Sequence, residues 1–276
     1  MNTLSVKIVR HPIIIDFNSG KIYGIFRGSK DSKKVVILCP AATGTRIGPQ
    51  RIYVEIAHKL EKINVASFCA DLPPLGDSFD NKIERYEGAY SERLAQQYSK
   101  YLKIIIEYLE NEFSFSEFIL LGISDACLPI YYYAKKSNEI QRVILLSPNH
   151  LLDTLQRINS KNLKQYYIKL FKKETWIKLI FLKLDIKKII RNIYRIPKRR
   201  KHPRRTFKEI KADRTIEGAL VIFGENDAKL KEYIEHWVKE KHNIGSYSER
   251  IIKGADHSFF GWQFKRDVEN AIIEWI

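Results

Sequence analysis

Short apolar runs recur along the chain, separated by stretches whose apolar residues have helical spacing. A run such as 35–39 has no polar alternation, which is typical of a strand buried on both faces. The runs predict strands over 6–17, 21–27, 35–39, 65–71, 118–123, 142–147, 219–223 and 249–252. Helices are expected around 53–60, 86–109, 127–134, 233–238 and 262–276. Strands that alternate with helices predict a mostly parallel sheet covered on both faces, preceded by one hairpin that turns at Asn18-Ser19-Gly20.

Length and composition fit this class. The 276 residues suffice for one large α/β domain, and 45% of them are hydrophobic. No apolar run approaches the roughly 20 residues of a membrane-spanning helix, and residues 1–7 lack the apolar core of a signal peptide. Cys39, Cys69 and Cys127 lie inside apolar runs without metal-like spacing, so we expect reduced core cysteines. These features predict a cytoplasmic protein without cofactor or metal.

The positive charge is concentrated in one segment. Between Leu151 and Asp213 there are twenty Lys and Arg against five Asp and Glu, which accounts for +15 of the net charge of +16. The rest of the chain is nearly neutral. Charge segregated in this way bears on binding partners and not on the fold.

The run from Phe118 ends at Gly122-Ile-Ser124-Asp-Ala126, directly before a predicted helix. A serine at a strand-to-helix turn, with tiny side chains two residues away on both sides, is typical of the nucleophile elbow of α/β-hydrolases. The small flanks are needed because the turn is tight. Ser124 is therefore the candidate nucleophile.

Two later strands supply partners for this serine. Asp227 follows the strand 219–223, and His257 lies in the loop after the last predicted strand. The order Ser124, Asp227, His257 is that of nucleophile, acid and base in this fold. His257 would remove the serine proton and Asp227 would orient the imidazole. Each residue also has a simpler explanation, such as a helix N-cap for Asp227. Glu225 is the second candidate acid and Asp256 a poorer one.

An oxyanion hole needs two backbone N–H groups directed at the developing charge. One is expected from Asp125, the residue after the nucleophile, and the other from Ala42 in the loop after the strand 35–39. Ala41, Thr43 and His150 are candidate pocket residues. Cys127, one helical turn past Ser124, is interpreted as a core residue and not as a second nucleophile.

These motifs give the chain a resemblance to α/β-hydrolases of the serine-aminopeptidase-like type, and most closely to the hydrolases associated with the exosortase A system. The resemblance rests on 46–54, 71–78, the elbow, 161–170 and 176–179. Ala41-Ala42 and Ala126 depart from it, since glycine is common in those places. The resemblance implies an ester or thioester hydrolase, or an acyltransferase, in bacterial surface-polysaccharide or lipid metabolism.

The basic segment occupies the place where α/β-hydrolases carry a cap, after the sixth core strand. We therefore expect a core of 1–148 with 214–276 and a helical cap of 149–213. Leu163, Tyr166, Tyr167 and Leu170 have helical spacing with lysines between them, which predicts amphipathic helices. Their apolar faces are expected to cover a lipophilic acyl pocket. The basic face is open to three interpretations, namely an acidic acyl carrier protein, an anionic inner-membrane surface, and nucleic acid as the weakest.

The sequence thus predicts an α/β-hydrolase fold and a serine hydrolase that cleaves a lipophilic ester or thioester through an acyl-enzyme. Two alternatives stay open. One is an acyltransferase that uses the same residues, and the other is a catalytically silent binding module that works through the basic cap.

Overall fold

The computed structural model describes residues 9–41, 44–82, 90–148, 214–228, 230, 234 and 244–276. The predicted cap at 149–213 lies outside the described residues, as do Ala42, Thr43 and His150. Most of the helix predicted over 233–238 lies outside them too. The described residues thus all belong to the predicted core.

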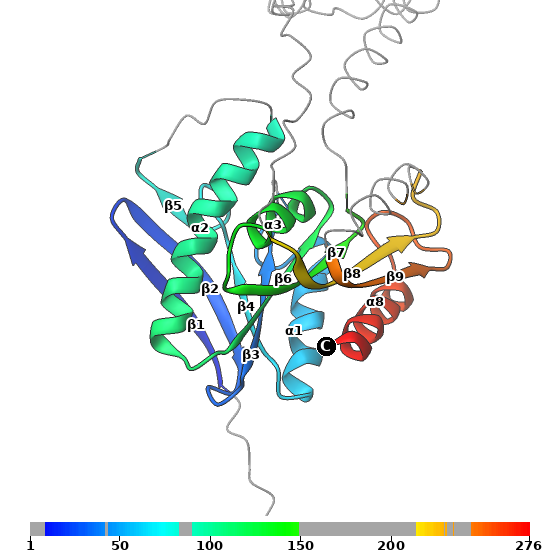
Figure 1. The fold of residues 1–276 in the computed structure, drawn as a ribbon, viewed down its shortest axis with the longest axis horizontal. Coiled ribbons are helices and arrows are strands. Elements are labelled where there is room, and N and C mark those ends of the chain that lie inside the picture. Colours follow the sequence, from blue (N-terminus) through cyan, green and yellow to red (C-terminus); the bar gives the residue numbers. More distant parts are fainter. Residues whose placement is uncertain are drawn as a thin grey trace, which may run out of the picture. The chain divides into compact units, whose positions relative to one another are not determined.

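A nine-stranded sheet forms the centre of the core, with the main strand order β1-β2-β4-β3-β6-β7-β8-β9 (Figure 1). Its strands are β1 (Val9–Phe17), β2 (Gly20–Gly28), β3 (Lys34–Cys39), β4 (Ala66–Ala70), β5 (Phe79–Asp80), β6 (Glu117–Ile123), β7 (Ile140–Leu146), β8 (Ile216–Gly224) and β9 (Ile244–Ile252). From β4 to β9 every neighbouring pair is parallel, whereas β1, β2 and β5 pair antiparallel. The predicted, mostly parallel sheet is confirmed.

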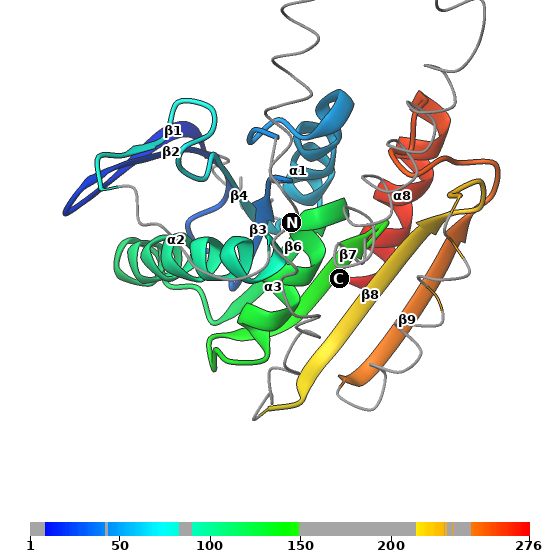
Figure 2. The same cartoon turned by 90° about the horizontal axis from the view of Figure 1, so that it is seen from above.

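Helices cover both faces of this sheet. Figure 2 shows α1 (Ile52–Lys62) and α8 (Trp262–Trp275) on one face, and α2 (Tyr90–Glu112) and α3 (Cys127–Ala134) on the other. Alternate residues of the strands point to opposite faces, so Val36 and Leu38 of β3 join the core under α1 and α8. Their neighbours Val35 and Ile37 are equally buried. Continuous apolar runs are therefore required in the central strands.

Beyond shifts of up to three residues at strand ends, two strands differ from the prediction. β9 begins at Ile244, five residues before the predicted start at 249, because an edge strand does not need an apolar run. Its residues from Gly245 to Arg250 are exposed or partly exposed. β5, which has only two residues, was not expected, and it pairs with the start of β2.

All three cysteines are buried and free. Burial raises the pKa of the Cys39 and Cys127 thiols well above their ordinary value and that of Cys69 to about 12. This agrees with reduced core cysteines. In the described part of the chain, no helix combines the length and the apolar character needed to cross a membrane.

Asp80 joins β5 to α2. Its side chain is 3% exposed and accepts hydrogen bonds from Lys100 Nζ at 2.8 Å and from the Tyr101 hydroxyl at 3.0 Å. Burial alone would raise the pKa of this carboxyl, but the hydrogen bonds from Lys100, Ser19, the Lys82 amide and Tyr101 outweigh burial and lower it to about 2.

We expect Asp80→Asn to lower the free energy of unfolding by about 1–2 kcal/mol at pH 7, because the charged carboxylate is the better acceptor. A carboxyl whose pKa is depressed from 3.8 to about 2 stabilises the fold above pH 4 and loses that effect as the pH falls to about 2. Urea unfolding of both proteins from pH 7 to pH 2 measures the difference. Asp16→Asn, which removes an exposed carboxylate paired with Lys21, is the control and should change stability by less than about 0.5 kcal/mol. An equal effect of both substitutions would contradict the assignment.

Candidate active site

Ser124 lies at the sharp turn between β6 and α3. Ile123 is extended, with φ −120° and ψ 142°, whereas Ser124 has a φ of +57° in the left-handed region. A short 3-10 turn over Ser124–Ala126 then leads into α3. A positive φ is costly for a residue with a Cβ, so the turn holds Ser124 in a strained backbone conformation.

The small residues that flank Ser124 meet across this turn. A Cβ on Gly122 would lie 2.8 Å from Ile130 Cδ1 and 3.1 Å from the Ala126 Cβ. Ala126 itself is fully buried. This agrees with the steric requirement expected from the sequence, and it explains why an alanine is tolerated at 126 while 122 is glycine.

The structure brings Ser124, His257 and Asp227 together. His257 Nε2 lies 2.9 Å from Ser124 Oγ, and His257 Nδ1 lies 2.5 Å from Asp227 Oδ2. Because a carboxylate only accepts hydrogen bonds, Nδ1 carries the imidazole proton and Nε2 is left to accept from the serine hydroxyl. The Asp227 side chain is 5% exposed and that of His257 is 34% exposed. The carboxylate is thus shielded from solvent, whereas the imidazole is partly exposed.

The loops after β8 and β9 are joined by hydrogen bonds. The Asn226 amide donates to the Ala255 carbonyl at 2.8 Å, and the Gly254 amide donates to Glu225 Oε2 at 2.7 Å. A Cβ on Gly224 would lie 2.3 Å from the Asp256 carbonyl oxygen, so only glycine permits this approach. This close approach of the two loops brings Asp227 next to His257.

Hydrogen bonds from loop amides occupy the other candidate acids. Glu225 accepts the Gly254 amide, and Asp256 Oδ1 accepts the amides of Ser258 at 3.0 Å and Phe260 at 2.8 Å. Both side chains thus hold loop backbone in place. Cys127, the remaining nucleophilic side chain near the turn, is buried and directs its thiol to the Gly122 and Leu146 carbonyls.

The loop after β3 is the expected source of one oxyanion donor. Its described residues include Ala41, which is partly buried and whose carbonyl accepts the Gly44 amide at 2.8 Å. Two tyrosines that sequence analysis did not single out hold the start of the loop. The Tyr53 hydroxyl donates to the Cys39 carbonyl at 2.6 Å, and the Tyr98 hydroxyl donates to the Pro40 carbonyl. Asp125, the other expected donor, directly follows Ser124 in the 3-10 turn.

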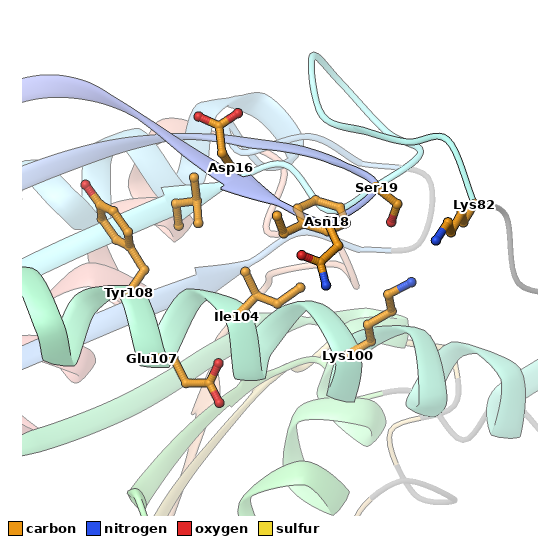
Figure 3. A pocket seen from close by; sticks show the side chains of 10 residues that line it. Asp16, Asn18, Ser19, Lys82, Lys100, Ile104, Glu107 and Tyr108 are labelled. Carbon is orange, nitrogen blue, oxygen red and sulfur yellow. The ribbon is translucent and has the colours of Figure 1, made fainter.

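A cavity of about 530 Å³ lies away from these residues, between the β1–β2 hairpin and α2. Figure 3 shows its lining side chains, among them Asp16, Lys100 and Glu107. None of the predicted site residues lines it. Within the described ranges, no group of three or more His, Cys, Asp and Glu side chains is arranged to hold a metal ion.

Comparison with solved structures identifies proteins that share the fold of this chain. An esterase from Pyrococcus furiosus, Pf2001, matches with a TM-score of 0.62 over 100% of this chain and 94% of its own, at 17% identity. Est1E from Butyrivibrio proteoclasticus, solved with ferulic acid bound, matches with a TM-score of 0.60 over 95% and 97% of the two chains, at 17% identity. A dienelactone hydrolase from Anabaena variabilis gives 0.59 over 98% and 97%, at 12% identity.

The protein has the α/β-hydrolase fold. No family model matches the sequence, and no curated protein is significantly similar to it. The expected α/β-hydrolase fold is thus confirmed by three-dimensional likeness at low identity. Ser124 directly follows β6 in this fold and begins the turn into α3.

We expect Ser124→Gly to be about 1 kcal/mol more stable than Ser124→Ala, because glycine adopts the left-handed conformation without the clash of a Cβ. Urea unfolding of the two variants, which both lack the hydroxyl, measures the difference. Ser246→Gly and Ser246→Ala are a suitable comparison, since Ser246 is an exposed residue of β9 without a positive φ and the order should not favour glycine there. If the alanine variant at 124 were as stable as the glycine variant, the strained elbow would be refuted.

Proposed function

We propose that the protein is a serine hydrolase that cleaves a carboxylic ester through Ser124, His257 and Asp227. The observation that carries the proposal is the continuous contact from Asp227 through His257 to Ser124. A serine hydroxyl is a poor nucleophile unless a base removes its proton during attack. This arrangement places the base next to the hydroxyl and an acid behind the base.

In the proposed reaction, Ser124 Oγ attacks the ester carbonyl while His257 Nε2 takes the hydroxyl proton. Asp227 stabilises the imidazolium that forms and keeps the proton on Nδ1. His257 then protonates the leaving alcohol, and an acyl group remains on Ser124. Water attacks this acyl-enzyme with His257 again as the base, which releases the acid and regenerates the serine. An alcohol or amine in place of water would make the same site an acyltransferase.

The negative charge on the oxygen of the tetrahedral intermediate needs hydrogen-bond donors to stabilise it. We assign them to the backbone N–H groups of Asp125 and Ala42, with Ala41, Thr43 and His150 around the pocket. The position of Asp125 supports the first donor, because this residue directly follows Ser124 in the 3-10 turn. A single such donor is typically worth about 10²–10³ in turnover.

The similar structures support an ester as the substrate class, since they include the Pyrococcus furiosus esterase and a dienelactone hydrolase. A lipophilic acyl group, a thioester and a role in bacterial surface-polysaccharide or lipid metabolism follow from the sequence resemblance and the predicted cap. We also propose a cytoplasmic protein whose basic segment binds an acyl carrier protein or an anionic membrane. These finer assignments remain part of the proposal.

The backbone of Ser124 argues against a silent binding module. A strained residue costs about 1–3 kcal/mol and persists only where the surrounding structure enforces it. A module that uses the fold as a scaffold has no need for a φ of +57° at a serine that contacts a histidine. A catalytic role for Ser124 would account for the strained conformation.

The decisive test is covalent labelling with a fluorophosphonate. We expect a single adduct on Ser124, formed as the serine oxygen displaces fluoride from phosphorus, and p-nitrophenyl ester hydrolysis that Ser124→Ala abolishes. His257→Ala should lose the adduct because the hydroxyl is no longer activated. Intact mass and peptide mapping measure both, and p-nitrophenyl and acyl-thioester substrates of increasing chain length size the pocket. A folded protein that gives no adduct would favour the binding module.

The two acids after β8 should differ in effect. We expect Asp227→Asn to lower kcat by about 10³–10⁴, as when a triad acid is lost. Glu225→Gln should retain most of the activity, because its amide oxygen can still accept the Gly254 N–H. Steady-state kinetics with p-nitrophenyl butyrate compares them. The reverse order of effects would identify Glu225 as the acid.

A further inference from the structure

A second cluster of charged side chains lies at the same edge of the sheet as Ser124. Its centre is Asp71, which follows β4 and is fully buried. Asp71 Oδ1 accepts the backbone amide of Arg46 at 2.6 Å, and Asp71 Oδ2 pairs with the Arg46 guanidinium. One carboxylate thus holds both the main chain and the side chain of Arg46, a residue of the loop between β3 and α1.

The chain after β4 folds around this carboxylate. The Asp77 amide donates to Asp71 Oδ2 at 3.0 Å, and the Asp77 carboxylate pairs with Arg46 Nη2 at 2.7 Å. Gly76 has a φ of +60°, and a Cβ there would lie 2.1 Å from Asp71 Oδ2. The Asp71 carboxylate is therefore enclosed by two loops, and glycine at 76 is required for that enclosure.

The position of the cluster relates it to the proposed reaction. The strand order β4-β3-β6 puts the loop after β3 between Asp71, which follows β4, and Ser124, which follows β6. Neighbouring strands lie about 4.8 Å apart. The described start of this loop, Pro40 and Ala41, thus leaves the strand next to that of the nucleophile, and Arg46 attaches a later part of the loop to Asp71.

The start of the same loop is held by a different set of residues. Tyr53 of α1 and Tyr98 of α2 donate to the Cys39 and Pro40 carbonyls, from helices on opposite faces of the sheet. The loop is therefore held at its start by two tyrosines and at Arg46 by the Asp71 carboxylate. Ala42, the oxyanion donor proposed from the sequence, lies between these two attachments in the chain.

We propose that Asp71 and Arg46 are positioning residues for the hydrolysis, because they fix the loop between β3 and α1 at Arg46, four residues after Ala42, to which the second oxyanion donor is assigned above. This inference rests on the proposed function. Misplacement of a group by about 1 Å costs about 10²-fold in rate.

The test compares Asp71→Asn with Asp77→Asn. Both remove one carboxylate that contacts the Arg46 guanidinium, but the Asp77 side chain is 64% exposed and its carboxylate does not hold the Arg46 amide. With p-nitrophenyl butyrate, we expect Asp71→Asn to lower kcat by about 10–100-fold with KM changed less than threefold. Asp77→Asn should stay within threefold of the wild type. Gly76→Ala keeps all the charges and should resemble Asp71→Asn.

Hydrogen exchange of the peptide that spans 40–48 supplies a readout independent of activity. We expect faster exchange in Asp71→Asn and Gly76→Ala than in Asp77→Asn and the wild type, with the β6 and β8 peptides unchanged. An unchanged kcat, or unchanged loop exchange, in folded Asp71→Asn would overturn the positioning role. A fall in kcat that matches only the loss of folded protein would do the same. Wild-type protein that fails to react with a fluorophosphonate would instead refute the proposed function.

Discussion

The left-handed backbone of Ser124 is the constraint on which the rest of the site depends. A serine at φ +57° cannot be held by its own turn, because the conformation is intrinsically unfavourable. It is held by β6, which is buried and paired on both sides, and by α3, whose Ile130 packs against Gly122. The strand and helix together project the hydroxyl from the sheet edge toward His257.

The other side chains reach Ser124 from long distances in the sequence. His257 is 133 residues away, and it arrives because β9 and β8 are parallel neighbours whose carboxyl ends meet at one edge. The approach of Gly224 to the loop after β9 then sets the distance between acid and base. The site therefore combines a locally strained nucleophile with partners that are rigid through backbone contacts.

The same edge carries a second set of contacts on the other side of Ser124. The loop after β3 is attached to two helices by Tyr53 and Tyr98. It is attached to the end of β4 by the contact of Arg46 with Asp71. Proposed base and acid thus lie on one side of the nucleophile, and the proposed oxyanion loop lies on the other. Each side is anchored by buried polar groups, which are costly unless they are paired and which therefore specify a single arrangement.

The sequence by itself determined the α/β class, the elements of the core and the three candidate residues of the triad. Apolar runs and helical spacing are local properties, and so are the small flanks of Ser124. It did not reveal the two-residue strand β5, the length of the polar edge strand β9, or the roles of Tyr53, Glu225 and Arg46. Only the tertiary structure decided these, because a hydrogen bond between residues 14 to 29 positions apart leaves no local pattern. Glycines 76 and 224 show the same limit, since what makes them necessary is a carboxylate or a carbonyl brought close by the fold.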